Sequence, residues 1–251
     1  MDKKNKIRKL RADILLLERE LAPDVEDARR LLLAGKVRWG SDHVVKNGAE
    51  MLPEDAVISV TEDSPYVSRG AFKLKPALDK YLPRLHGMVA MDVGASTGGF
   101  TDLMLQQGAA KVYAVDSGRG QLHDKLRRDS RVAALEQTNA RTLPDDFIDE
   151  KLDLLTMDVS FISVTAILPS VDRFLKPGGY GFILVKPQFE AAREEVETGG
   201  VVRDEAVRMK CVEKVAAAAR RLQWTPLEWL PCEIKGPKGN QEYLYVFRKC
   251  L

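Results

Sequence analysis

The sequence predicts an α/β protein with a mostly parallel sheet of seven strands, the last of them antiparallel, preceded by a small α+β module. Two observations predict the sheet: short apolar runs alternate with segments of helical period from residue 89 onward, and a glycine-rich turn follows the first run. Such alternation is typical of parallel strands joined by helices that cover both faces. The first sixty residues have a different pattern of helical stripes and short strand-like runs, which predicts a separate module.

The expected module comprises residues 1–60. One helix is expected over Leu10 to Leu21, and a second from Asp24, its predicted N-cap, to Gly35, a residue type that often ends helices. Short strands are expected at 36–39, 44–45 and 57–60, separated by turns at 46–48 and 53–55. Two helices packed on a small curled sheet would make a compact unit.

A polar, proline-containing stretch places a linker at residues 61–67 and a larger domain at residues 68–251. The larger domain is expected to open with a helix carrying Phe72 and Leu78, which Pro76 would kink or begin. Strands are expected at 89–93, 111–115, 131–135, 152–157, 181–185, 226–232 and 241–247, with a long helix at 205–222. Sheets of this kind bind ligands at the carboxyl ends of their strands.

The turn after the first core strand runs from Asp92 to Gly99 and contains Gly94 and Gly98. Glycines let the backbone bend sharply and approach a ligand closely, and the following helix offers free N–H groups. The next strand ends in Asp116, whose carboxylate could accept both ribose hydroxyls of an adenosine. The spacing is not GxGxxG and no Lys-Ser/Thr pair follows, which disfavours a nicotinamide-dependent oxidoreductase and a P-loop. A plain strand-to-helix connection stays open.

Composition sets outer bounds on function. The 251 residues are 45% hydrophobic and 30% charged, as in ordinary soluble proteins, and the net charge of +2 does not establish a nucleic-acid partner. Basic residues do cluster at the start, where the alternative is a solvated, frayed terminus. They are Lys3, Lys4, Lys6, Arg8, Lys9 and Arg11.

The cysteines and histidines show no metal-binding spacing, so no metal is expected. Three cysteines far apart (Cys211, Cys232 and Cys250) suggest free thiols in a reducing cytosol, and we expect a cytoplasmic protein. No apolar run approaches the 18 residues of a membrane span, and no signal peptide is apparent, so no membrane partner is expected. The sequence leaves the oligomeric state open.

Four charged residues lie at the ends of predicted strands or beside an aromatic residue. They are Lys73, Asp158, Lys186 and Glu242. Lysines and carboxylates are seldom buried unless they are paired. Each of the four taken alone could be a solvated strand end, but all four beside a ligand-binding turn indicate a functional cluster.

The module resembles the RNA-binding module named after ribosomal protein S-four, in Arg11-Ala-Asp-Ile-Leu-Leu and Ala28-Arg-Arg-Leu-Leu-Leu-Ala-Gly-Lys-Val37. The resemblance implies basic side chains that contact RNA phosphates and supply affinity without sequence choice. Asp24-Val25 stands where that family usually has Ser-Arg, so a module that only packs against the larger domain stays open. The candidates carried over, with two from the start of the larger domain, are Lys9, Arg11, Arg29, Arg30, Lys36, Arg38, Ser68 and Arg69.

The larger domain resembles FtsJ-like ribose 2′-O-methyltransferases, whose catalytic set is Lys-Asp-Lys-Glu, and the whole chain resembles the TlyA family, which joins an S-four-type module to such a domain. The segments that carry the match are 68–74, 92–102, 138–141, 158–163, 185–190, 199–204 and 235–242. The resemblance implies a Rossmann-like methyltransferase fold, S-adenosylmethionine as cofactor, and ribosomal RNA in ribosomal subunits as partner, with cytidine 2′-hydroxyls as targets. Family members are often labelled haemolysins.

The resemblance and simple charge logic together assign catalytic roles. A ribose hydroxyl needs proton removal during in-line attack, and a lysine can take that proton only when neutral. Lys186 is the expected base, Lys73 would orient the ribose, Asp158 would lie between cofactor and lysine, and Glu242 would position either lysine. For the cofactor, Asp116 would hold the ribose diol and Asn139 the adenine amine. The full set of expected cofactor contacts is Asp92, Gly94, Ala95, Ser96, Thr97, Gly98, Gly99, Phe100, Asp116, Asn139 and Asp158.

Three aromatic side chains could contact the cofactor, although any one of them could instead pack in the core. Phe100, Phe161 and Phe189 could form walls of the cofactor site.

Two other functions remain as alternatives. A membrane-active haemolysin would need an amphipathic or apolar membrane segment, and the helix at 205–222 with its basic face is the nearest candidate, although a helix covering a sheet looks the same. A non-catalytic RNA-binding or ribosome assembly factor could keep the fold without the chemistry, and the intact set of four charged residues argues against it.

Overall fold

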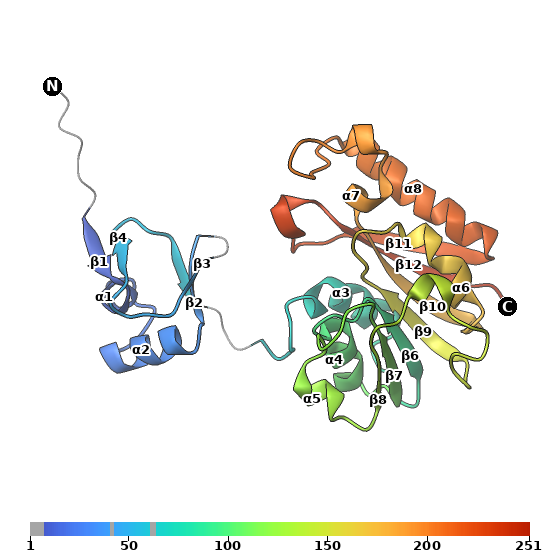
Figure 1. The fold of residues 1–251 in the computed structure, drawn as a ribbon, viewed down its shortest axis with the longest axis horizontal. Coiled ribbons are helices and arrows are strands. Elements are labelled where there is room, and N and C mark those ends of the chain that lie inside the picture. Colours follow the sequence, from blue (N-terminus) through green and yellow to red (C-terminus); the bar gives the residue numbers. More distant parts are fainter. Residues whose placement is uncertain (1–7, 41–42, 61–63) are drawn as a thin grey trace. The chain divides into compact units, whose positions relative to one another are not determined.

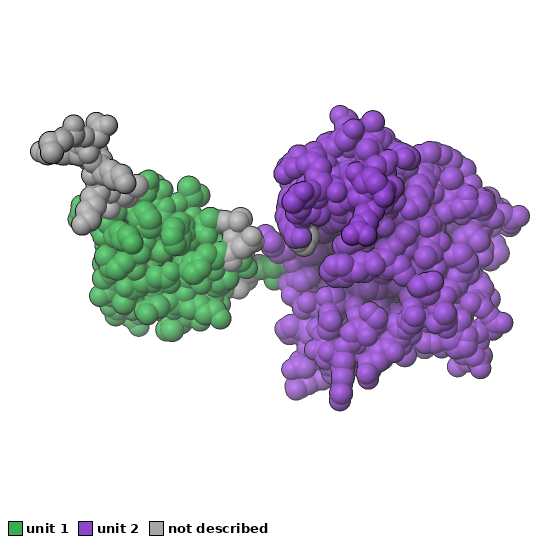
Figure 2. Space-filling view, turned by 45° about the horizontal axis from the view of Figure 1, so that its top comes forward, with its two compact units in different colours: residues 1–65 green, residues 66–251 purple. Residues whose placement is uncertain are grey.

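The computed structural model describes residues 8–40, 43–60 and 64–251, and contacts divide the chain into two compact units, residues 1–65 and 66–251 (Figure 1, Figure 2). Each unit has an apolar core of its own. Residues 61–63 of the predicted linker, and the basic residues Lys3, Lys4 and Lys6, lie outside the described residues.

The first unit packs two helices against two small sheets. Its elements are β1 (Lys9–Arg11), α1 (Ala12–Glu18), α2 (Val25–Leu33), β2 (Val37–Trp39), β3 (His43–Val45), β4 (Met51–Pro53) and β5 (Ile58–Val60). Antiparallel strands β1 and β4 form one sheet, and β3, β2 and β5 form the other. Buried leucines and valines of both helices and both sheets form one core, so the unit is stabilised by its own apolar burial.

The second helix follows the sequence pattern, whereas the first is shorter than predicted. Asp24 caps α2 by accepting a hydrogen bond from the Asp27 amide at 2.8 Å, and Gly35 beyond its end has a φ of +66°. Leu10 was expected in a helix, but it lies opposite Leu52 in an antiparallel pair that the sequence did not reveal. The helix ends early because Glu20 has a φ of +55°, outside the helical region.

The second unit contains a seven-stranded sheet in the order β11-β12-β10-β9-β6-β7-β8 (Figure 1). Strands β6, β7, β8, β9 and β10 are parallel, and β12 is antiparallel to both of its neighbours, as predicted for the last strand. The strands are β6 (Val89–Val93), β7 (Lys111–Val115), β8 (Val132–Leu135), β9 (Leu152–Met157), β10 (Leu175–Val185), β11 (Trp224–Pro231) and β12 (Tyr243–Lys249).

Helices cover both faces of this sheet, because successive strand residues point to opposite sides and each side is apolar. One core joins the sheet to α3, α4 and α5, and the other joins it to α6 and α8. The α-helices are α3 (Ala71–Tyr81), α4 (Gly99–Gln106), α5 (Asp124–Arg127), α6 (Leu168–Asp172), α7 (Pro187–Glu190) and α8 (Glu205–Arg221), and the short 3-10 turns are η1 (Ala140–Thr142), η2 (Val164–Ala166), η3 (Arg193–Glu195) and η4 (Pro237–Gly239).

Two element boundaries differ from the prediction for local reasons. Helix α3 begins at Ala71, so Pro76 lies inside it and does not mark its start. Strand β10 begins at Leu175, which pairs with Leu152, although its register shifts before Tyr180. The sequence did not predict the early part of this strand, because its proline and glycines are residue types that rarely occur inside strands.

Candidate active site

Four charged side chains from distant parts of the sequence meet at one edge of the large sheet. Lys73 comes from the first turn of α3, Asp158 follows β9, Lys186 follows β10, and Glu242 precedes β12. Because β12 runs antiparallel, its start lies at the same edge as the ends of its parallel neighbours. The four residues form two ion pairs, Lys73 with Glu242 and Lys186 with Asp158.

The first pair is enclosed. The Lys73 Nζ lies 2.6 Å from Oε2 of Glu242, and the Glu242 side chain is fully buried while that of Lys73 is 11% exposed. The other carboxylate oxygen accepts a hydrogen bond of 3.4 Å from the Gln188 amide. Gly236 packs so closely on Glu242 that a β-carbon there would collide with the carboxylate. Glu242 is therefore braced on both oxygens and pairs with Lys73 rather than with Lys186.

The second pair faces a cleft. The Lys186 Nζ lies 2.6 Å from Oδ1 of Asp158, whose side chain is 23% exposed, and donates a hydrogen bond of 3.0 Å to the Ser160 hydroxyl. Asp158, Ser160, Lys186 and Lys73 all line the part of the cleft beside the glycine turn. This pair can therefore meet a ligand directly.

The buried carboxylates determine the charge of Lys73. Burial alone lowers the pKa of Lys73, but the negative charges of Asp158 and Glu242 and the hydrogen bond to Glu242 outweigh it, so its pKa is raised. Cys232 lies beside this group, and burial raises the pKa of its thiol to about 12. Lys73 is thus a fixed cation flanked by a neutral thiol.

The glycine turn brings the backbone of β6 against that of β9. Gly94 has a φ of +82°, and a β-carbon there would collide with the carbonyl oxygen of Asp158. Gly98 has a φ of +98° and packs against Leu122, just before α5, and Leu126 within α5. These two positions need glycine, since other residues rarely adopt that conformation and would not fit.

Asp92 braces the turn from below. It is buried and accepts hydrogen bonds from the amide and hydroxyl of Thr101 at 3.0 and 2.7 Å and from the Thr156 hydroxyl at 2.9 Å. Burial, opposed by those threonine hydrogen bonds and reinforced by the charge of Asp158, raises its pKa to about 6. Asp92 lines the cleft, but its carboxylate oxygens already accept hydrogen bonds that connect β6 to α4 and β9.

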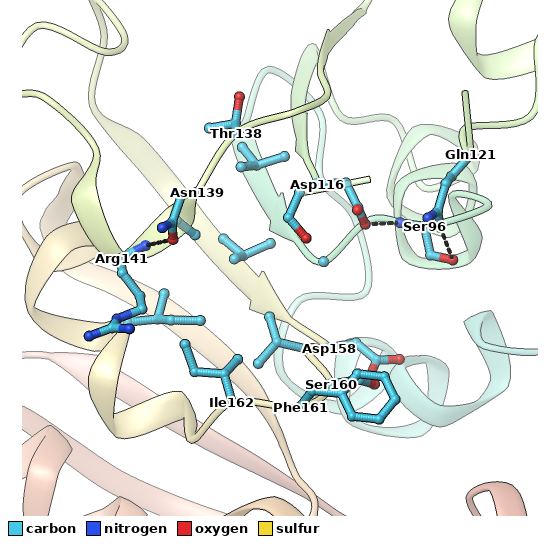
Figure 3. A pocket seen from close by; sticks show the side chains of 17 residues that line it. Ser96, Asp116, Gln121, Thr138, Asn139, Arg141, Asp158, Ser160, Phe161 and Ile162 are labelled. Atoms are coloured by element: carbon cyan, nitrogen blue, oxygen red, sulfur yellow. Dashed lines mark hydrogen bonds between the residues drawn. The ribbon is translucent and has the colours of Figure 1, made fainter. Parts of the chain in front are cut away.

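A second part of the cleft, of about 590 Å³, continues along the ends of β7 and β9 (Figure 3). Asp116 stands in it, with its carboxylate oxygens accepting hydrogen bonds from the amides of Ser96 at 2.8 Å and Gly118 at 2.7 Å. Asn139 also lines it, and its amide oxygen accepts a 3.1 Å hydrogen bond from the Arg141 amide. The two parts of the cleft share Gly94, Ser96, Asp158 and Ser160, so they form one continuous groove.

The comparisons with known proteins agree with this architecture. A family profile described as FtsJ-like methyltransferase matches residues 66–249. A curated relative from Mycobacterium tuberculosis, named 16S/23S rRNA (cytidine-2′-O)-methyltransferase TlyA, is 40% identical over 96% of this chain and 90% of its own length. The chain belongs to the TlyA family of FtsJ-like methyltransferases. The resemblance drawn from the sequence motifs is confirmed.

Other TlyA-type relatives carry a different name. A Brachyspira hyodysenteriae protein named hemolysin A is 38% identical over 88% of this chain and 92% of its own length. A solved structure from Streptococcus thermophilus, described as a candidate hemolysin, is 39% identical, covers 97% of this chain and 90% of its own, and superposes with a TM-score of 0.74. The fold of this TlyA-family chain is therefore that of solved proteins.

The groove fits S-adenosylmethionine, the cofactor of this FtsJ-like chain. Gly94 opens the backbone where a side chain would fill the space, and Asp116 presents a carboxylate at the end of β7, the position that binds ribose hydroxyls in such sheets. Ala95, Thr97, Gly99 and Phe100 line the part of the groove beside Lys73. Gly98 is not among the lining residues; it packs under the turn, so its contribution is to shape the groove.

Aromatic residues fall into two groups. Phe100 is buried in the core beneath the groove, as the packing alternative proposed. Phe161 is 92% exposed with a φ of +65°, and its ring centroid lies 5.2 Å from that of Phe189. An apolar ring exposed in a strained conformation at the mouth of a groove indicates a contact surface for a ligand.

Basic side chains of the first unit gather around one buried acid. Asp13 has a fully buried side chain, and Arg11 and Arg29 reach it at 2.6 and 3.3 Å, beside a cavity of about 350 Å³ that Lys46 also lines. The hydrogen bond from Arg11 holds the pKa of Asp13 below its usual range.

The remaining RNA candidates are dispersed. Lys9 is exposed on β1, Arg30 pairs with Asp27 at 2.6 Å, Lys36 is half-buried, and the guanidinium Nε of Arg38 is buried without a hydrogen bond. In the second unit Ser68 lines the groove and Arg69 is exposed. Only Arg11 and Arg29 therefore converge at a cavity of the first unit.

Three residues that shape the groove escaped the sequence reasoning. Ser160 and Gln188 lie inside quoted motifs but have no charge to mark them. Glu136 accepts hydrogen bonds from the amides of Gly120, Gln121 and Leu122, which fixes a wall of the groove and lowers its pKa to about 2. Its position directly after β8, at the carboxyl end of a parallel strand, could have marked Glu136 as a candidate from the sequence.

Within the described residues, no cluster of histidine, cysteine and acidic side chains suited to a metal ion occurs. Among the same residues, no helix is long and apolar enough to cross a membrane.

Proposed function

We propose that this chain is an S-adenosylmethionine-dependent ribose 2′-O-methyltransferase that acts on cytidine in ribosomal RNA. The observation that carries the proposal is the meeting of Lys73, Asp158, Lys186 and Glu242 beside a glycine turn at one sheet edge. The relative from M. tuberculosis is named for this reaction on 16S and 23S rRNA. Family membership and site geometry thus support the same chemistry.

The cleft-facing pair performs the proton transfer in this proposal. When bound, the cofactor supplies a methyl group on a positively charged sulfonium. Lys186 would accept, on a neutral amine, the proton that the ribose 2′-hydroxyl loses when its oxygen is methylated. Burial lowers the pKa of Lys73, but the charges of Asp158 and Glu242 raise it overall, so Lys73 stays a cation and the proton transfer is assigned to Lys186.

The other groups position the reactants. Lys73, held by Glu242, orients the ribose through its ammonium, and Asp158 holds the Lys186 amine at the edge of the groove. Each carboxylate oxygen of Asp116 accepts one hydrogen bond from a backbone amide and has a second lone pair. These second lone pairs would accept hydrogen bonds from the ribose hydroxyls of the cofactor. Asn139 can accept the adenine amine on the second lone pair of its amide oxygen. Close positioning of this kind supplies much of the rate of such a transfer.

The first unit supplies RNA affinity in this proposal. Residues 1–60 act as an S-four-type module, joined by residues 61–67 to the methyltransferase domain of residues 68–251. Arg11 and Arg29, preorganised by Asp13 beside a cavity, are the phosphate contacts that geometry favours in the first unit, and exposed Arg69 is the candidate in the second unit. We expect the enzyme to work in the cytoplasm, on ribosomal subunits.

Transfer of labelled methyl groups to ribosomal subunits tests the proposal. Subunits from a strain that lacks the enzyme are incubated with purified protein and labelled cofactor, and the RNA is digested to nucleosides. We expect a labelled 2′-O-methylcytidine with wild-type protein and none with Lys186→Ala. Labelling on a base or on protein, or equal labelling by both proteins, would show that the assigned reaction or site is wrong.

A haemolytic activity, suggested by the names of some relatives, makes a different prediction. Leakage of liposomes by purified protein, unchanged in Lys186→Ala, would favour membrane activity over methyl transfer. Helix α8, the candidate membrane segment, packs its buried side chains Val212, Val215 and Ala219 on the sheet, so its apolar face is already covered.

A further inference from the structure

The amine of Lys186 has two neighbours of different kinds. Oδ1 of Asp158 lies 2.6 Å away, yet no hydrogen bond of normal geometry reaches that oxygen. The Ser160 hydroxyl, at 3.0 Å, accepts a hydrogen bond of normal geometry from the same amine. Asp158 therefore supplies charge attraction, which has little directional preference, while Ser160 supplies direction.

We propose that Ser160 is a positioning residue for methyl transfer, which fixes the rotation of the Lys186 amine so that the base faces the ribose hydroxyl. This inference rests on the proposed function. A lysine amine rotates freely about its last carbon–nitrogen bond, and a base works only when its lone pair points at the proton. The hydrogen bond to Ser160 restricts rotation of the amine at a point where both residues line the groove.

The loop that carries Ser160 is fixed well enough for this role. The Val164 amide donates a hydrogen bond of 2.7 Å to buried Glu190, and this backbone contact remains when the Ser163 hydroxyl, which also donates to Glu190, is removed. Lys214 of α8 pairs with Glu190 at 3.1 Å. Because Glu190 ends α7, which directly follows Lys186, the two segments are tied together at both ends.

The position of Ser160 in the groove also places it beside the reacting groups. It lines both parts of the groove, next to Asp158 in one and next to Phe161 in the other.

Three variants test the role of the hydroxyl. Ser160→Ala removes the acceptor, Ser160→Thr restores it, and Ser163→Ala removes a hydroxyl from the same loop that contacts Glu190 and not Lys186. We expect Ser160→Ala to slow single-turnover transfer to saturating ribosomal subunits by about 10–100-fold, because misplacement of a base costs rate in this range. The dissociation constant for S-adenosylmethionine, measured by calorimetry, should change less than about 2-fold. Ser160→Thr should recover most of the rate, and Ser163→Ala should stay near wild type.

A measurement without turnover reports the same contact. In protein with ¹³C- and ¹⁵N-labelled lysine, NMR relaxation of the Lys186 terminal group gives its order parameter, which we expect to be higher in wild type than in Ser160→Ala.

The outcomes separate this inference from the proposed function. If wild-type protein labels RNA and Ser160→Ala matches its rate, or Ser163→Ala is slowed equally, Ser160 does not position the base and the methyltransferase assignment stands. An unchanged Lys186 order parameter in Ser160→Ala would also overturn the inference. If wild-type protein transfers no methyl group to RNA, both proposals fail.

Discussion

The two ion pairs of the site use the same chemical partners in different surroundings. Glu242 is fully buried, braced by Gln188 and a close glycine, and keeps Lys73 charged, whereas Asp158 is partly exposed and shares Lys186 with a serine hydroxyl. The acids differ in burial, whereas the two lysine side chains are almost equally buried, at 11% and 10% exposed, and both line the groove. The surroundings of the acids therefore distinguish the two pairs, and in the proposed function the pair with the more exposed acid carries the proton transfer.

Arginine substitutions test this division most strongly. Arginine keeps the positive charge but does not give up its proton near neutral pH. Lys186→Arg should therefore lower the single-turnover rate by roughly 10²–10⁴-fold, the usual contribution of a general base. Lys73→Arg should keep a larger share of the rate, because only a cation is needed there. Quench-flow measurement of methyl transfer compares them, and equal losses would break the comparison.

Substitution of each acid should lower the free energy of unfolding by a different amount in the two pairs. Glu242→Gln keeps the shape but leaves Lys73 as a buried cation without its counter-charge, which should lower the free energy of unfolding by about 3–5 kcal/mol. Asp158→Asn should cost less, because the Asp158 side chain is 23% exposed and Ser160 still accepts a hydrogen bond from Lys186. Urea titrations of both variants measure these values. A loss in Asp158→Asn as large as that in Glu242→Gln would contradict the assigned burial.

Asp92 is a buried acid that forms no ion pair with any described residue, and its stability contribution therefore has a pH dependence opposite to that of an ion-paired acid. Its pKa is raised from 3.8 to about 6 in the folded protein, so the folded state holds the proton more tightly than the unfolded state. The contribution of Asp92 to stability therefore falls as pH rises from about 4 to about 6. Asp92→Asn removes this dependence, so the variant should gain stability relative to wild type over that range. Denaturant unfolding at a series of pH values measures the difference, and parallel curves would contradict the raised pKa.

The smallest effect is expected in the first unit, where the acid is buried and its cations are exposed. If Arg29, held by Asp13, contacts an RNA phosphate, Arg29→Ala should weaken binding and reduce the slope of log affinity against log salt by about 0.7–0.9. Arg30→Ala is the matched control, because Arg30 pairs with Asp27 on the same helix. Filter binding with ribosomal RNA fragments at several salt concentrations distinguishes the two. Equal slopes for Arg29→Ala and wild type would remove Arg29 from the interface.

The sequence predicted the parallel core and the edge where the charged residues meet, because both depend on short-range patterns. Lys186 directly follows a run of buried apolar residues, and Asp158 follows another, so their place at strand ends was visible. The pairing was not visible: Glu242 could have served either lysine, and the packing of α3 and Gly236 decided for Lys73. Ser160 was overlooked because nothing in the sequence distinguishes it from other loop serines. Its role follows only from the Lys186 amine that lies 3.0 Å from its hydroxyl in the fold.

The first unit shows the limit of periodicity. Leu10 fits a helical stripe with the leucines that follow it, yet it pairs with Leu52, far along the chain. The alternating pattern of a three-residue strand is too short to be told apart from the helical period of the adjoining residues. Such a strand is recognised only from the distant strand with which it pairs.

The position of β12 has a consequence for synthesis of the protein. This strand is threaded between β10 and β11, and Glu242 stands at its start, so an incomplete chain that stops before residue 242 has neither the middle of that half of the sheet nor the anchor for Lys73. If the proposed reaction is right, a chain truncated before residue 242 should therefore have no partial methyltransferase activity.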